Sequence, residues 1–222
     1  MTAAAAMVHH RHHHLWPLVV AACPAGELAH DAQHILRVYR WALRLADEAA
    51  VDRDLAGAAA LVHDLVFVPK DSDQRATGGE RSAAAAPAVL RQVGYDDSAI
   101  VAIADAVRTC SWSRGLPPTS PLGALLQDAD RLDALGAIGL ARLYACAQFM
   151  STAEKPGQLQ HGDDPAGNSD RTLSDKHQAA DHIRIKLLKL SESMHFPSAQ
   201  AEARRRHAYL LSHLDALRSE QA

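Results

Sequence analysis

The 222-residue sequence predicts an all-α fold, and two observations carry this prediction. From residue 26 onward, apolar residues return at steps of three and four, which is the period of a helix with one buried face. No stretch alternates β-branched and polar residues as a half-buried strand does. A chain of this length can bury one well-formed core. We therefore expect a single helical bundle over residues 26–222, completed by C-terminal helices.

The expected helices follow one another along the chain. The first covers residues 29–50, where Ile35, Val38 and Ala42 share one face, and a short, nearly all-apolar helix follows over residues 54–66. Further helices are expected at residues 83–93, 97–110, 122–130, 132–149, 173–193 and 198–218. The glycine-rich polar segment between them, residues 151–170, is expected to be an exposed loop.

The N-terminal residues 1–25 are rich in alanine and histidine, and we expect them to form a disordered tail that binds divalent metal at most loosely. The apolar stretch 15–23 is not typical of a signal peptide, because no Lys/Arg-rich start precedes it and Pro17 interrupts it.

Composition excludes several classes of function. A net charge of -3 gives no basic excess for nucleic-acid binding, and no apolar run reaches the ~20 residues that span a membrane. Cys23, Cys110 and Cys146 are scattered and lack CxxC spacing, as is typical of reduced thiols. We expect a cytoplasmic protein without nucleic-acid or membrane partners.

The residues that point to chemistry are two histidines and two aspartates. His63 and Asp64 close an apolar helical run, His34 lies upstream, and Asp130 follows in an acidic cluster. Imidazole and carboxylate together suit divalent first-row ions. Adjacent residues point about 100° apart on a helix, so His63 and Asp64 share an ion only beside a helix end. A core histidine next to a helix-terminal aspartate is the alternative, and the order of the four residues favours the metal site.

Four segments carry a family resemblance. They are HDAQHILRV at residues 30–38, HDLVFVPK at 63–70, QDADRLDALGAIGLAR at 127–142 and DHIRIKLLKL at 181–190. Together they resemble the HD-domain superfamily of metal-dependent phosphohydrolases, whose pattern is H…HD…D, over residues 28–215. The resemblance implies metal ligands at His34, His63, Asp64 and Asp130. Asp128 competes with Asp130, but on a helix the two point about 200° apart.

The resemblance also suggests roles for residues around the ion. His30 would support the ligands or pack as an ordinary polar residue, and Asp31 would orient a ligating imidazole. Substrate phosphates would be neutralised first by Lys70 and Arg75, and less directly by Lys186. The general base stays open among four residues, which are Asp71, Asp73, Asp128 and Asp133.

The implied activity is hydrolysis of a nucleotide or other phosphoester by water that a single divalent ion activates. Release of pyrophosphate from nucleoside triphosphates is the favoured reaction, and Mn²⁺ is the favoured ion, ahead of Mg, Co, Ni, Fe or Zn. A di-iron oxygenase would need more histidines, and none occurs between Leu65 and Ala129.

The rival interpretation is a metal- and nucleotide-binding sensor with little turnover. Related sequences commonly read AHSFS where this chain has TCSWS, so that Cys110 stands in the place of a histidine. A homodimer is a further interpretation. The small residues Gly136 and Gly139 allow close approach of another helix, and that helix could belong to the same core or to a second subunit.

Overall fold

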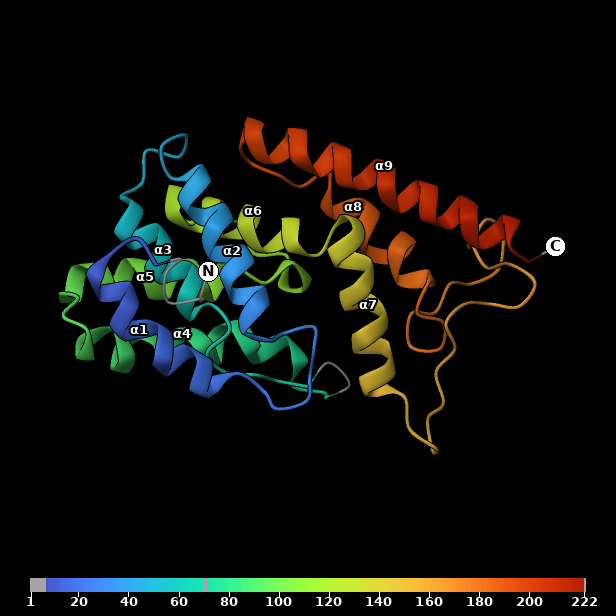
Figure 1. Cartoon of the computed structure of the whole chain (residues 1–222), viewed down its shortest axis with the longest axis horizontal. Helices are drawn as coiled ribbons and strands as arrows, with labels where there is room; N and C mark the ends of the chain where they lie inside the picture. The colour runs from blue at the N-terminus through green and yellow to red at the C-terminus, as the bar shows by residue number, and fades with distance from the viewer. Residues whose placement is uncertain (1–6, 70–71, 222) are drawn as a thin grey trace. The chain divides into compact units, whose positions relative to one another are not determined.

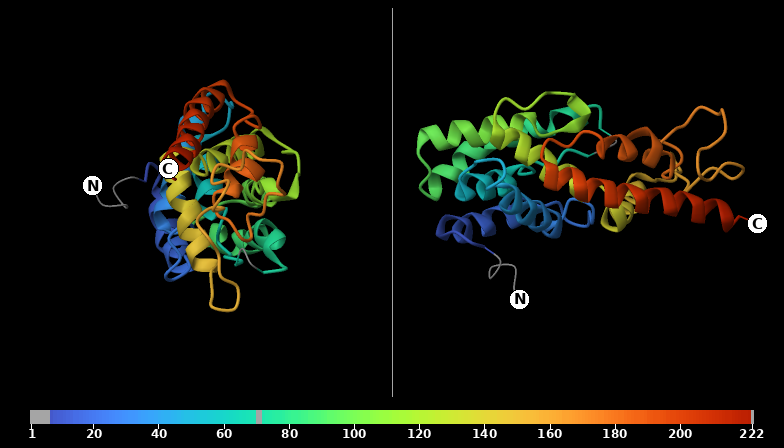
Figure 2. Two further views of the ribbon diagram at one scale, coloured as in Figure 1. Left: turned by 90° about the vertical axis from the view of Figure 1, so that its right-hand side faces the viewer. Right: turned by 90° about the horizontal axis from the view of Figure 1, so that it is seen from above.

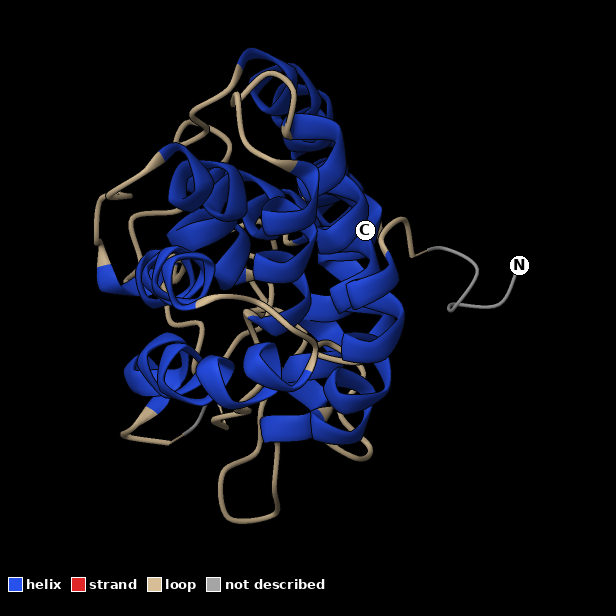
Figure 3. Ribbon diagram, turned by 90° about the vertical axis from the view of Figure 1, so that its left-hand side faces the viewer, coloured by secondary structure: helices blue, strands red, loops and turns tan. Residues whose placement is uncertain are grey.

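The computed structural model describes residues 7–69 and 72–221, and these residues form helices joined by turns and loops (Figure 3). The only strand-like pairing among them is an isolated bridge between Gln158 and Gln178. The predicted all-α class is confirmed. The helices are α1 (His10–Ala22), α2 (Ala32–Leu45), α3 (Arg53–Val62), α4 (Gly78–Gln92), α5 (Asp97–Thr109), α6 (Pro121–Asp133), α7 (Gly136–Met150), α8 (Leu188–Leu190) and α9 (Pro197–Ser219). Two short 3₁₀ turns, η2 (Arg75–Thr77) and η3 (Trp112–Arg114), lie between helices, and a π-helical segment, η4 (Ile183–Leu187), leads directly into α8.

The chain divides into two compact units. The first contains the described residues of 1–26 together with 30–130, and the second contains 27–29 and the described residues from 131 onward. In the first unit, α3 packs against α1, α2 and α5, and α4 packs against α5 (Figure 1). In the second unit, α7 packs against α9, which continues without a break for 23 residues (Figure 2). Within the described residues, no helix combines the length and the apolarity that crossing a bilayer requires.

The helix α3 lies at the centre of the first unit. Every residue from Ala56 to Val62 is buried, and most of them are alanine or glycine. Small side chains let neighbouring helices approach closely. This close packing fixes the position of α3 and therefore of the residue that follows its C-terminal end. The next residue along the chain is His63.

The helix α1 corrects the expectation of a disordered tail, which is wrong for residues 10–22. One face of this helix is buried. It carries His12, Leu15, Trp16 and Val19, which are three, one and three residues apart and therefore lie on the same side of a helix. The His-rich composition and Pro17 concealed this stripe. Residues 1–6 also belong to the expected tail, and they lie outside the described residues.

His12 fixes α1 to the rest of the first unit. Its ring is fully buried. Because a carbonyl oxygen can only accept, Nε2–H donates to the Asp54 carbonyl at 3.0 Å, and Nδ1 accepts from the Tyr39 hydroxyl at 2.9 Å. Burial lowers the pKa of His12, although the neighbouring Asp54 offsets part of that effect. The ring therefore serves as a neutral hydrogen-bonding group that holds α1 against α2 and α3.

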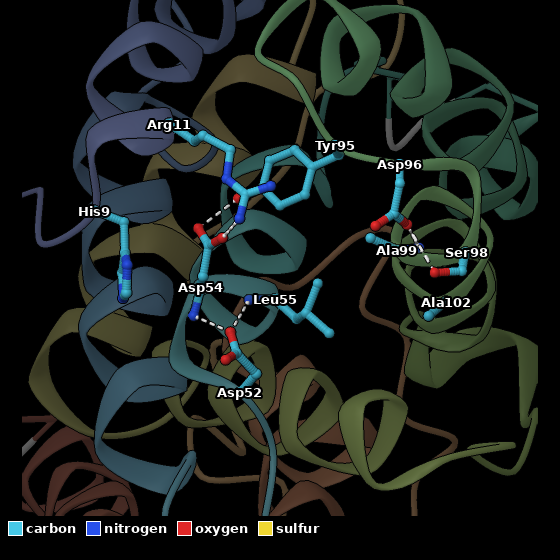
Figure 4. A pocket seen from close by; sticks show the side chains of 10 residues that line it. All are labelled: His9, Arg11, Asp52, Asp54, Leu55, Tyr95, Asp96, Ser98, Ala99 and Ala102. Atoms are coloured by element: carbon cyan, nitrogen blue, oxygen red, sulfur yellow. Dashed lines mark hydrogen bonds and ion pairs between the residues drawn. The ribbon is translucent and has the colours of Figure 1, made fainter.

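Arg11, the neighbour of His12, adds a charged contact. Its guanidinium pairs with the Asp54 carboxylate and lies 4.2 Å from the centre of the Tyr95 ring. Tyr95 donates its hydroxyl proton to the same carboxylate at 2.7 Å. These side chains line an open pocket of about 590 Å³, also bordered by Asp52 and residues of α5 (Figure 4). Asp54 thus joins residues from three separate parts of the unit.

The segment between α7 and the C-terminal helices is organised by Arg171. Its guanidinium contacts Asp164 at 2.9 Å and both oxygens of Asp181 at 2.5 and 2.7 Å. Burial would raise the pKa of Asp164, but hydrogen bonds from Asn168, Ser169 and Arg171 bring it to about 2. Asp181 also accepts from the Ser174 amide. Residues 173–180, which lie within this network, are not helical, so the expected helix 173–193 is wrong for that part.

The two glycines at the start of α7 have explanations within this chain. Gly136 has a φ of +73°, a conformation that residues with a Cβ rarely adopt, and it lies against the Arg206 side chain. A Cβ on Gly139 would lie 2.2 Å from the Ala134 carbonyl oxygen. Neither position requires a second subunit, and the homodimer stays a prediction.

Gly57 provides a test of how tightly α1 is fixed. A Cβ there would lie 2.4 Å from the His12 ring and 2.8 Å from the Tyr39 ring, and His12 is hydrogen-bonded on both ring nitrogens. Alanine raises helix propensity by about 1 kcal/mol, whereas overpacking of a core costs roughly 1–3 kcal/mol. We expect Gly57→Ala to lower the free energy of unfolding, measured by urea denaturation.

Gly162→Ala is the matched control, because a Cβ at Gly162 has no neighbour within 4 Å. It should leave stability unchanged or raise it by up to about 1 kcal/mol. A Gly57→Ala protein as stable as the natural one would contradict the tight packing of α1 on α3.

Candidate metal centre

His34 is placed by the beginning of α2. Asp31 is the N-cap of this helix, and its carboxylate accepts a hydrogen bond from the His34 amide at 2.9 Å. Aspartate at an N-cap satisfies a backbone N–H that the helix itself leaves unpaired. The His34 side chain is fully buried. The helix start thus fixes the backbone from which this imidazole projects.

His63 and Asp64 lie just beyond the end of α3. The helix was expected to continue to residue 66, but it ends at Val62, and His63 is its C-cap. Beyond it, the Val66 amide donates to the Ser82 hydroxyl at 3.1 Å, which ties the departing chain to α4. Because the chain leaves the helix here, the 100° divergence of adjacent helical residues no longer separates the two side chains.

The tautomer of His63 follows from its hydrogen bond. Nδ1 lies 2.7 Å from the Ala60 carbonyl oxygen, which can only accept, so Nδ1 carries the proton. In the neutral ring, Nε2 then carries the lone pair, on the other side of the ring. A histidine that donates one ring N–H to a backbone carbonyl is oriented to bind a metal through the other nitrogen.

Four side chains converge at this point. His34 Nε2 and His63 Nε2 are 3.2 Å apart. Asp64 Oδ2 lies 3.5 and 3.6 Å from these two nitrogens, and Asp130 Oδ1 lies 3.7 and 3.8 Å from them. Ligand atoms of His34, His63 and Asp130 all lie within 4.8 Å of one another. The imidazoles are buried, whereas Asp64 and Asp130 keep 38% and 30% of their side chains exposed, so the carboxylates face the opening of the site.

This arrangement fits a divalent cation. Two nitrogens each about 2.0–2.1 Å from a tetrahedral ion lie about 3.3 Å apart, close to the observed separation. Two nitrogens that face each other with carboxylates around them need a proton or a cation between them. Burial alone would raise the pKa of Asp64, but the positive charge that His63 and His34 can carry holds it well below its usual range. The donor set of two imidazoles and two carboxylates suits first-row divalent ions.

Three other predicted residues lie in the same unit. The His30 ring lies 5.9 Å from the ring of His34 and 5.9 Å from that of Phe67, measured between ring centres. Asp31 acts on the backbone of α2, through the hydrogen bond from the His34 amide. Asp128 is completely buried. His30 and Asp31 therefore lie next to His34, and their supporting roles stay predictions, while Asp128 lies within the core.

The structure does not test the remaining predicted residues. Lys70 and Asp71 lie outside the described residues, as does the side chain of Arg75. Asp133 and Lys186 belong to the second unit, where Asp133 pairs with Arg142 at 3.1 Å. Their roles toward a substrate stay predictions.

Sequence reasoning missed how Asp130 is positioned. Gln127 is buried and donates to the carbonyls of Thr109 and Leu116, at 2.7 and 3.1 Å. It thereby joins α6 to the end of α5, one turn before Asp130. The only signal in the sequence was its place at the head of the QDAD motif.

Cys110 lies beside the proposed ligand Asp130. Its Sγ is 3.9 Å from Asp130 Oδ2 and 3.9 Å from the Leu126 carbonyl oxygen, and the residue is buried. The position at which this chain departs from related sequences is therefore next to the centre itself.

Two buried histidines and two half-buried aspartates that converge at helix ends define an all-α domain with a candidate metal centre. Comparison with known proteins identifies its family: residues 31–135 match the family model of the HD domain. The chain is also 31% identical to the uncharacterized protein YpgQ of Bacillus subtilis (strain 168) over 185 residues, which cover 82% of this chain and 80% of YpgQ. The chain belongs to the HD-domain superfamily.

Solved structures agree with this assignment. The crystal structure of B. subtilis YpgQ in complex with ADP has a TM-score of 0.66 and 26% identity, over 93% of this chain and 95% of that one. A Lactobacillus plantarum protein has a TM-score of 0.74 at 24% identity, over 96% and 98% of the two chains. An HD-superfamily hydrolase of Bacillus thuringiensis has a TM-score of 0.63 at 24% identity, over 95% and 97%. The last two show the shared fold.

Substitutions at Asp31 separate a capping role from an electrostatic one. Asp31→Ala removes the cap and should cost about 1 kcal/mol of stability. It should also weaken metal binding by roughly 10–100-fold, as loss of a supporting group does. Asp31→Ser keeps a capping oxygen without the charge, and we expect it to retain most of both. Urea denaturation and Mn²⁺ titration calorimetry measure the two effects. If Asp31→Ser binds Mn²⁺ as weakly as Asp31→Ala, the carboxylate acts through its charge instead.

Proposed function

We propose that this protein is a metal-dependent phosphohydrolase that acts on a nucleotide. The observation that carries the proposal is the convergence of His34, His63, Asp64 and Asp130 on one point, in a chain that belongs to the HD-domain superfamily. One divalent ion would be held by these four residues, with Mn²⁺ the favoured metal. When bound, such an ion supplies a Lewis acid for the phosphoryl group and lowers the pKa of water.

The chain's own residues would prepare this site in two ways. The hydrogen bond from His63 Nδ1 to the Ala60 carbonyl selects the neutral tautomer in which Nε2 carries the lone pair, and the low pKa of Asp64 keeps that carboxylate ionised. Both effects would present ligand atoms to one cation. The partial exposure of Asp64 and Asp130 leaves one side open for a substrate, whereas the buried imidazoles close the other.

A nucleotide substrate is supported by a relative. YpgQ of B. subtilis has been crystallised in complex with ADP, and it is 26% identical to this chain in that structure. A site that accepts ADP fits an activity on nucleoside di- or triphosphates. Within that class we favour hydrolysis of triphosphates with release of pyrophosphate.

The groups that would neutralise and attack the phosphates remain predictions. Lys70 and Arg75 follow the HD pair in the sequence and are our candidates for the phosphate charges. Among the aspartates considered as general base, Asp128 is completely buried and Asp133 is paired with Arg142. Asp73 is exposed and is the better candidate among the described residues. The expected location is the cytoplasm, in keeping with Cys23, Cys110 and Cys146, none of which forms a disulfide with another described residue.

The second candidate function is a metal- and nucleotide-binding sensor with little turnover. The specific observation in its favour is Cys110, which stands beside Asp130 where related sequences commonly have histidine. A thiol supplies neither the charge nor the proton-transfer capacity of an imidazole near neutral pH.

Product analysis distinguishes the two functions. The full chain with Mn²⁺ is incubated with a panel of nucleoside di- and triphosphates, and phosphate and pyrophosphate are quantified separately. We expect pyrophosphate and a monophosphate from at least one triphosphate. Asp64→Asn, which keeps the shape but removes the charge, should lower kcat by at least about 100-fold, because removing one electrostatic group at a reacting centre costs that much.

Asp97→Asn is the control, because Asp97 lies on α5 with 85% of its side chain exposed. It should keep full activity. Release of phosphate without pyrophosphate would support the hydrolase and show that a different phosphate bond is cleaved. Stabilisation by nucleotide without turnover of any member of the panel would establish the sensor.

A further inference from the structure

Two histidines on the surface of α1 form a second cluster of metal-ligating atoms. His10 and His14 are one helical turn apart, and both are exposed. Their Nε2 atoms are 3.2 Å apart, and their ring centres are 4.5 Å apart. Residues four apart on a helix are surface neighbours, so the helical conformation itself brings the two rings together.

The geometry of this pair matches that of chelation. The separation of the two Nε2 atoms equals the 3.2 Å found between His34 and His63 in the candidate centre. It is also close to the distance of about 3.3 Å that two nitrogens adopt on a tetrahedral ion. The two exposed rings need no rearrangement of the backbone to share one cation.

The donor set determines which cation fits. The first turn of α1 contains no acidic residue, so the ligands that this turn itself offers are imidazole nitrogens. Imidazole favours Cu²⁺, Ni²⁺ and Zn²⁺, whereas Mg²⁺ and Mn²⁺ favour carboxylate and carbonyl oxygens. The pair on α1 therefore differs in preference from the centre at His34, which also offers two carboxylates.

We propose that His10 and His14 form a surface site for an imidazole-preferring divalent cation, and that the bound cation stabilises α1. This helix begins weakly: its N-cap residue His9 makes no side-chain capping bond, no acidic residue lies in its first turn, and Pro17 interrupts its interior. A cation shared by residues 10 and 14 holds the first turn in the helical conformation, because the helical conformation brings these two rings together.

The residues between the two proposed ligands link the site to the packing of α1. Arg11 and His12 are the residues that attach α1 to Asp54, as Figure 4 shows for Arg11. A helical first turn presents these two side chains to Asp54 together. Occupancy of the site therefore stabilises the attachment of α1 to α3. This inference does not depend on the hydrolytic activity.

The test counts Ni²⁺ ions and measures their effect on α1. Equilibrium dialysis of the full chain against Ni²⁺ should show one equivalent more for the natural protein than for His10→Gln or His14→Gln. Hydrogen exchange should show Ni²⁺ slowing exchange of the α1 amides in the natural protein, and Mn²⁺ having no such effect. In both variants Ni²⁺ should leave the α1 amides unchanged.

His13→Gln is the matched control, because His13 is an exposed histidine of the same tract. It should retain the additional equivalent and the slowed exchange. If His13→Gln loses as much Ni²⁺ as His10→Gln, the tract binds diffusely and the proposal is wrong. It is equally wrong if the double variant His10→Gln, His14→Gln binds as many equivalents as the natural protein. Unfolding without metal is measured for every variant, and an unchanged midpoint shows that loss of binding is not loss of structure.

Discussion

The structure of the first unit depends on one constraint, which is that two buried imidazole nitrogens lie 3.2 Å apart. Because Nδ1 donates to the Ala60 carbonyl, the neutral His63 ring has its lone pair on Nε2. Two nitrogen lone pairs that face each other at this distance are unfavourable unless a proton or a cation lies between them. Asp64 and Asp130 bring negative charge to the same point. A divalent cation satisfies all four groups at once, and the surrounding helices maintain the arrangement.

Each ligand is held by a different local device. Asp31 caps α2 beneath His34, the end of α3 releases His63 and Asp64, and Gln127 joins α6 to α5 one turn before Asp130. The small, fully buried residues of α3 connect this centre to the face on which α1 is attached through His12. The same central helix, α3, therefore serves both packing and the candidate metal centre. Its N-terminal end binds α1, and its C-terminal end leads into His63 and Asp64.

Much of this could be predicted from the sequence. The helical period gave the all-α class, and the order of His34, His63, Asp64 and Asp130 gave the four residues that converge. The helix α1 was missed because its histidines and Pro17 hide an apolar stripe. The true end of α3 depends on a hydrogen bond from Val66 to Ser82 in another helix. Residues 173–180 were expected to be helical but are not, and Arg171 holds Asp164 and Asp181 together around them. Such contacts join distant residues, and no local pattern announces them.

We expect one cation to bind among His34, His63, Asp64 and Asp130. Anomalous diffraction at the manganese absorption edge, from crystals of the Mn²⁺-loaded chain, would locate it. We expect one strong peak within coordination distance of both Nε2 atoms and of an oxygen from each carboxylate. The contradicting result is an empty centre in which the two nitrogens keep their 3.2 Å separation, with manganese bound elsewhere or not at all.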